Sequence, residues 1–178
     1  KLTFEDGGLR KIKVGNVEIL RMIYMAVRDH NWGTILPEVR NLEIQENHDT
    51  FQICFENQYK KADIDFSFHV TITGKDNLID FEIEGEALSG FRTNRVGFCV
   101  LHPIRECAGK ECEVTGPDGE KQSFSFPKSI SPHQPMKNIS EMRWKVDQNI
   151  EARLSFEGDI FEMEDQRNWT DDSFKTYC

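Results

Sequence analysis

The sequence predicts an all-β fold, and more specifically a large antiparallel β-sandwich. Apolar and polar residues alternate with a period of two along most of the 178 residues, which is typical of strands with one wet face. Helical patterns are short, because residues 36–39 and 139–142 each offer a single turn that is unstable alone. Roughly ten strands joined by hairpins, without crossover helices, imply one sheet packed on another.

The clearest element is a hairpin in the first half of the chain. Residues 62–73 alternate regularly, 74–77 read as a turn, and 78–84 alternate again on the return. The apolar positions of these strands and of residues 150–157 are expected to be buried, namely Phe66, Phe68, Phe81, Leu154 and Phe156. The other predicted strands cover residues 17–27, 42–45, 51–56 and 161–163.

Residues 1–178 are predicted to form a single β-sandwich domain. The length suits one domain, and no low-complexity linker or internal repeat divides the chain. The sequence begins with Lys1 rather than Met, and its last residues still read as ordered polypeptide. We therefore expect a fragment of a longer multidomain protein.

The charge balance argues against two classes of partner. The net charge is −9, which disfavours binding to nucleic acid phosphates and to anionic membrane surfaces. No apolar run approaches the roughly 20 residues that span a bilayer. The five cysteines cannot all pair, and buried free thiols suit a reducing compartment, so a cytoplasmic location is expected. Cys107 and Cys112 leave a disulfide or a weak zinc signal open.

His102 is the first candidate site residue. It ends the run 96–103 and has the same parity as its apolar residues, so it lies on their face of the strand. One interpretation is a core or capping histidine satisfied by the backbone, and the other is a general acid or substrate ligand at a strand end. Nearby, Arg95 can pair with the acidic surface or bind a sugar carboxylate.

A proline-rich loop over residues 126–135 is the second candidate. Rigid loops often carry sites, and this one presents His133 and Gln134. The alternative is a rigid connection without chemistry.

The third candidate is the string from Glu162 to Trp169. Phe161 and Met163 point inward, so Glu162 and Glu164 share the opposite face, roughly 6 to 7 Å apart along the strand. Such a pair can supply acid and base or hold a cation. The candidates for substrate binding that follow are Arg167, Asn168 and Trp169. Of these, Trp169 can stack on a sugar ring. A solvated acidic strand followed by a capped turn is the plainer alternative.

These three segments resemble the N-terminal region of the bacterial D-apionate lactonase family, which acts in the breakdown of apiose. The resemblance covers most of residues 90–178 and is most specific over Glu162 to Tyr177. It implies a β-sandwich similar to the galactose-mutarotase supersandwich, followed by a barrel and a further β domain that are absent here. In mutarotase-like proteins a strand carboxylate acts as base and a histidine as acid. The resemblance thus makes Glu162, Glu164, His102 and His133 the candidate catalytic residues.

Three functional hypotheses follow. The leading one is the N-terminal domain of a hydrolase that opens a sugar lactone, using a base to activate water and an acid to protonate the leaving ring oxygen. A self-sufficient mutarotase-like enzyme and a non-catalytic carbohydrate-binding or structural module are the alternatives. The expected partners are a small carbohydrate or sugar lactone and the C-terminal domains of the same protein. No cofactor and no metal ion is predicted, and the isolated domain need not be active.

Overall fold

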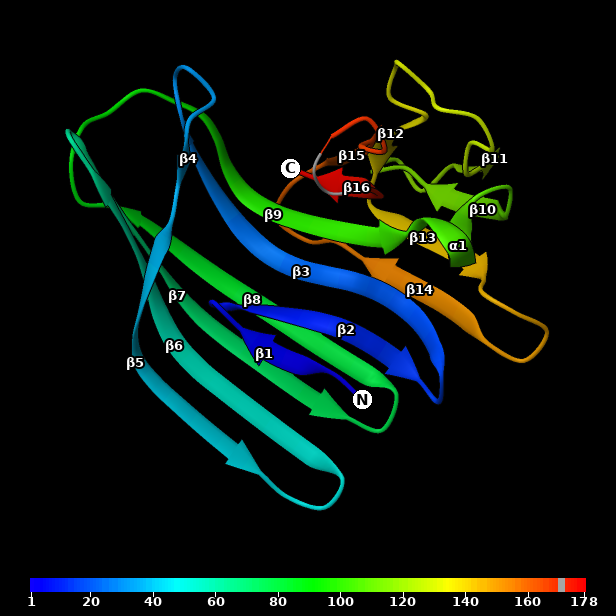
Figure 1. Cartoon of the computed structure of the whole chain (residues 1–178), viewed down its shortest axis with the longest axis horizontal. Helices are drawn as coiled ribbons and strands as arrows, with labels where there is room; N and C mark the ends of the chain where they lie inside the picture. Colours follow the sequence, from blue (N-terminus) through cyan, green and yellow to red (C-terminus); the bar gives the residue numbers. More distant parts are fainter. Residues whose placement is uncertain (170–171) are drawn as a thin grey trace. The chain divides into compact units, whose positions relative to one another are not determined.

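The computed structural model describes residues 1–169 and 172–178 and consists almost wholly of antiparallel strands (Figure 1). The structure confirms the predicted all-β class, and its several antiparallel sheets are consistent with a β-sandwich. The chain divides into two compact units, of which unit 1 comprises residues 1–25 and 97–178 and unit 2 residues 26–96. That the whole chain is a single domain stays a prediction.

The strands form three sheets. The largest has eight strands in the order β1-β2-β3-β9-β16-β15-β12, with β4 paired to β3. Its strands are β1 (Thr3–Glu5), β2 (Gly8–Val14), β3 (Val17–Asp29), β4 (Thr34–Ile35), β9 (Thr93–Pro103), β12 (Met136–Ile139), β15 (Phe161–Asp165) and β16 (Ser173–Tyr177). The second sheet has the order β5-β6-β7-β8, with β5 (Pro37–Glu46), β6 (Thr50–Lys61), β7 (Ile64–Lys75) and β8 (Leu78–Ala87). The third has the order β11-β10-β13-β14, with β10 (Glu111–Thr115), β11 (Lys121–Ser125), β13 (Glu141–Lys145) and β14 (Glu151–Ser155).

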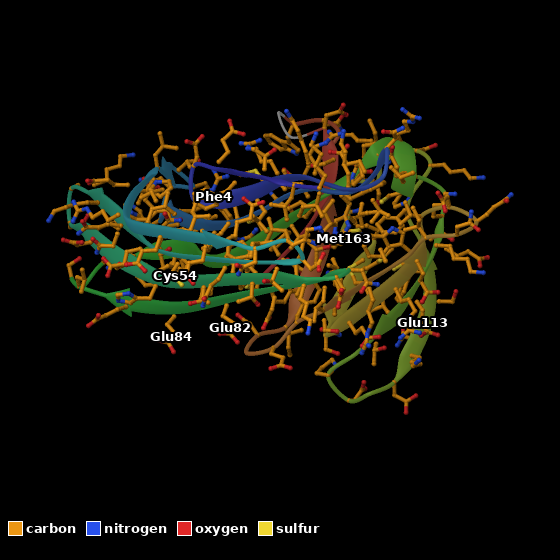
Figure 2. The ribbon with its side chains drawn as sticks, turned by 90° about the horizontal axis from the view of Figure 1, so that it is seen from below. Phe4, Cys54, Glu82, Glu84, Glu113 and Met163 are labelled. Carbon is orange, nitrogen blue, oxygen red and sulfur yellow. The ribbon has the colours of Figure 1, made fainter. Side chains whose placement is uncertain are left out.

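The sheet of unit 2 is a meander of long hairpins, and it confirms the hairpin predicted from the alternating pattern. Lys75 of β7 pairs with Leu78 of β8 across a two-residue turn in which Asp76 adopts a left-handed φ of 54°. Alternation gives this sheet an apolar and a polar face. Glu82 and Glu84 belong to the polar face and project from β8 into solvent (Figure 2).

Burial is incomplete for part of the predicted core. Phe66 and Phe68 of β7 are buried, as expected for a central strand with a neighbour on each side. The full burial predicted for Phe81, Leu154 and Phe156 is wrong, because all three are only half-buried. Phe81 and Leu154 lie on the edge strands β8 and β14. Phe156 follows β14 and stacks on Phe161, with ring centroids 3.9 Å apart.

The two short helical patterns do not form helices, as expected for single turns that are unstable alone. Residues 36–39 enter strand β5, and 139–142 join β12 to β13. Pro37 can begin a strand because β5 lies at the edge of its sheet, where a residue without a backbone N–H costs no hydrogen bond between strands. Within the described residues the only helix is the four-residue α1 (Ile104–Cys107), which follows β9. No helix there is long and apolar enough to cross a bilayer.

Unit 1 is itself built of two packed layers. One face of β9, β16 and β15 lies against the sheet that contains β10 and β13. The rings of His102 on β9 and Trp144 on β13 are 5.4 Å apart, and the Thr176 hydroxyl on β16 lies 3.6 Å from the sulfur of Met142. Met163 belongs to this core and is fully buried (Figure 2).

Candidate functional site

The pairing of β15, β16 and β9 sorts the predicted site residues onto two faces of one sheet. Glu162 is opposite Tyr177 and Glu164 is opposite Lys175, so these four side chains share a face. Asp165 is opposite Phe174, which in turn is opposite His102 on β9. The two glutamates and His102 therefore point to opposite sides of the sheet.

Glu162 and Glu164 converge on one phenol. The hydroxyl of Tyr177 lies 2.6 Å from Oε1 of Glu162 and 2.5 Å from Oε1 of Glu164. The phenol carries one proton, so it can donate to only one carboxylate at a time. The three groups therefore belong to one hydrogen-bonded cluster.

The cluster continues through an amide to a lysine. The side-chain amide of Gln166 donates to Oε2 of Glu164 at 2.7 Å, and its oxygen accepts from Nζ of Lys175 at 3.3 Å. Tyr177 and Lys175 are 2% and 7% exposed, whereas both carboxylates are half-buried. The buried residues thus fix the carboxylates in place while leaving them partly accessible, which suits proton transfer to a bound molecule. We call Glu162, Glu164, Gln166, Lys175 and Tyr177 the carboxylate–tyrosine cluster.

His102 is a core histidine, although its hydrogen-bond partner is a side chain and not the backbone. Its side chain is fully buried between the rings of Phe126 and Trp144, and its Nε2 lies 2.8 Å from the hydroxyl of Thr176. Burial lowers the pKa of His102 from 6.5 to about 3, so the ring is neutral near pH 7. The four candidate catalytic residues are therefore not all brought together, because the strand register puts His102 on the face opposite Glu162 and Glu164. A role for His133 beside the carboxylates stays a prediction.

Arg167 holds a loop in place. Its guanidinium makes two hydrogen bonds to the carboxylate of Asp165, at 2.9 and 2.6 Å. It also donates to the carbonyls of Lys128 and Pro127, and it lies 5.0 Å above the Phe174 ring. These contacts occupy the side chain that was predicted to bind substrate. They also hold the proline-rich loop against the polar residues that follow β15.

The remaining predicted residues are spread over several places. His133 is exposed and Gln134 half-buried in the proline-rich loop, where the hydroxyl of Ser131 donates to the carbonyl of His133. Asn168 and Trp169 are exposed beyond β15. Arg95 belongs to unit 2, with its guanidinium 5.8 Å from the ring centroid of Trp32. The binding roles of these residues stay predictions.

Tyr177 and Lys175 are the residues that sequence reasoning missed. They alternate with Phe174 and Thr176 in the last strand, so their shared face is visible in the sequence. What the sequence does not give is the register between β15 and β16, because seven residues connect these two strands. Without the register, the phenol cannot be paired with the carboxylates.

The cysteines form no disulfide with one another within the described residues. Cys99, Cys107 and Cys112 are buried. Burial raises the pKa of Cys107 and of Cys112 to about 12. Among the described residues, no group of three or more His, Cys, Asp or Glu side chains is arranged to hold a metal ion.

Comparison with known proteins identifies the family. The family described as "D-apionate lactonase, N-terminal domain" matches residues 1–178. The chain belongs to this family. It is also 36% identical over 178 residues to a D-apionate lactonase of Brucella anthropi, an alignment that covers 99% of this chain. The resemblance drawn from the three segments is thereby confirmed and extends over the whole chain.

The chain spans only part of that relative. The alignment covers 29% of the Brucella anthropi D-apionate lactonase, so most of that protein has no counterpart in these 178 residues. No solved structure matches the chain.

Proposed function

We propose that this chain is the N-terminal domain of an enzyme that hydrolyses a sugar lactone, with the lactone of D-apionate as the first substrate to test. The observation that carries the proposal is the match of the family to all 178 residues, together with the 36% identity to a D-apionate lactonase. Because the relative is much longer, the proposed activity belongs to the full-length protein.

The carboxylate–tyrosine cluster is the part of this domain that suits the reaction. Lactone hydrolysis needs a base to activate water for attack on the ring carbonyl and an acid to protonate the ring oxygen that leaves. Glu162 and Glu164 are half-buried, and both contact the hydroxyl of Tyr177. In the proposed role, one carboxylate accepts a proton from water and the cluster returns a proton to the leaving oxygen.

The activity itself is tested with the full-length protein. The lactone of D-apionate is added at neutral pH and the acid released on ring opening is followed with a pH indicator. The expected result is a rate proportional to enzyme concentration and well above the spontaneous hydrolysis. A rate no higher than the spontaneous one, on this lactone and on other aldonolactones, would overturn the proposal.

A further inference from the structure

An exposed tryptophan, Trp32, lies in unit 2 on the loop between β3 and β4. Trp32 is 59% exposed there, although indole is among the most favourable side chains to bury. Its φ is 66°, in the left-handed region, which is a genuine outlier for a bulky side chain. Such strained residues persist only where their surroundings hold them, and they cluster at functional sites.

The chain around Trp32 holds it firmly in this conformation. The carboxylate of Asp29 accepts hydrogen bonds from the backbone N–H groups of Asn31 and Gly33, at 2.9 and 2.7 Å. The guanidinium of Arg28 donates to the carbonyl of Trp32 at 3.3 Å and to the hydroxyl of Thr34 at 2.6 Å. The backbone that carries the exposed indole is therefore held in place by hydrogen bonds.

A second segment of unit 2 is tied to this loop and brings a cation to the indole. The Thr93 hydroxyl donates to the carbonyl of Arg28, and the Asn94 amide donates to the carbonyl of His30, both at 2.6 Å. Next in the chain, Arg95 places its guanidinium 5.8 Å from the centroid of the Trp32 ring. A forked cation thus lies over one face of the flat apolar ring.

We propose that Trp32 and Arg95 form a binding site for the ring of a carboxylated sugar. The indole would stack on the apolar face of the sugar ring, and the guanidinium would bind the carboxylate, for which its planar donors are suited. Local charge suits an anionic ligand, because Arg28 and Arg95 lie on these two segments and the carboxylate of Asp29 accepts hydrogen bonds from the loop backbone. The site is independent of the proposed lactone hydrolysis.

The surroundings of Trp32 favour a sugar over a protein partner. The core of a protein–protein interface is apolar and poor in charge. The exposed neighbours of Trp32 in the two segments are instead polar side chains that suit sugar hydroxyls, namely His30, Asn31, Arg92 and Asn94. Leu36, which is 80% exposed, is the nearby apolar residue that a protein contact would use.

The test uses full-length protein labelled with 5-fluorotryptophan and observed by fluorine NMR. The signal of Trp32 is identified by its loss in Trp32→Phe. Galacturonate is titrated as the probe with a ring and a carboxylate, and galactose as the same ring without the charge. The Trp32 signal should shift saturably with galacturonate at about 1 to 10 mM, and at least about tenfold higher galactose should be needed.

Two variants sharpen the result. In Arg95→Gln, the shift of the Trp32 signal with galacturonate should fall to that seen with galactose. Arg105→Gln is the control and should leave the shift unchanged, because Arg105 is an exposed arginine of unit 1. Equal responses to the two sugars, or an unchanged response in Arg95→Gln, would overturn the proposal. A Trp32 signal that shifts with neither sugar would also overturn the proposal. If a soluble gadolinium chelate then failed to broaden that signal, the loop would be assigned to a protein contact.

Discussion

Arg167 makes a two-point ion pair with Asp165, which lies only two residues before it in the chain. The side chain of Asp165 is fully buried and that of Arg167 is 12% exposed. The same carboxylate accepts a hydrogen bond from the backbone N–H of Ser131 at 2.9 Å, and the same guanidinium donates to the carbonyls of Pro127 and Lys128. One ion pair therefore fastens the proline-rich loop to the end of β15.

Substitution of Arg167 by Lys should destabilise unit 1, because a lysine keeps the charge but cannot make the forked contacts. The free energy of unfolding should fall by about 2 to 3 kcal/mol, measured by denaturant titration. Arg153→Lys is the matched control, because Arg153 pairs with Glu141 at the surface and should leave the unfolding midpoint nearly unchanged. Equal shifts in the two variants would contradict the structural role of Arg167.

Acid should destabilise the fold through His102. Its pKa is about 3 when folded and 6.5 ordinarily, so below pH 6.5 the unfolded chain binds a proton that the folded chain excludes. The stability present above pH 6.5 is lost as the pH falls toward 3, by at most about 1.4 kcal/mol per pH unit. Denaturant titrations at several pH values measure this slope.

The matched variant for His102 replaces both members of its hydrogen bond, as His102→Leu with Thr176→Val. This change leaves neither partner unsatisfied, so the core should still fold. The part of the pH slope that belongs to His102 should disappear. An unchanged slope between pH 6.5 and pH 4 would show that His102 is not the group responsible.

The thiols should react in two classes. Cys107 and Cys112 are buried and their pKa is raised to about 12, so they have little thiolate at pH 8 and should be protected in the folded protein. Cys54 and Cys178 are only half-buried and should react first. Titration with an aromatic disulfide, with and without denaturant and followed by mass spectrometry, gives the order. Early labelling of Cys107 would contradict this assignment.

The core of unit 2 should tolerate change at its edge but not at its centre. Phe68 lies on the central strand β7 and is 3% exposed, so Phe68→Ala should cost about 3 to 5 kcal/mol. Phe81 lies on the edge strand β8 and is half-buried, so Phe81→Ala should cost clearly less. Calorimetric or denaturant unfolding compares the two. A larger loss for Phe81→Ala would place the centre of the core elsewhere.

Much of the fold could be predicted from the sequence because alternation reports directly on strands. The pattern over residues 62–84 predicted β7 two residues too early at both ends, and it predicted the start of β8 but ended that strand three residues early. The strand at Pro37 was missed because proline is read as a strand breaker, although an edge strand tolerates it. Full burial of Phe81 and Leu154 was overestimated because alternation shows which face a residue lies on and not whether its strand is central.

The site was harder to predict because it depends on register. The sequence showed that Glu162 and Glu164 share a face, and it left open whether His102 belongs to the core. It could not show that Tyr177 is opposite Glu162, since pairing between β15 and β16 is set by packing of the whole sheet. The expectation that Arg167 binds substrate overlooked its nearest carboxylate, Asp165, two positions away.

We propose that the carboxylate–tyrosine cluster of this domain takes part in lactone hydrolysis by the full-length enzyme. The most direct measurement is the kcat for the lactone of D-apionate in Glu162→Gln, Glu164→Gln and Tyr177→Phe, with the exposed Glu157→Gln as control. Loss of a general acid or base should lower kcat by about 10²- to 10⁴-fold in at least one glutamate variant. Tyr177→Phe should shift the pH–rate profile, and Glu157→Gln should behave as wild type. Wild-type kcat in all three cluster variants, each folded by circular dichroism, would contradict the claim and place the chemistry outside this domain.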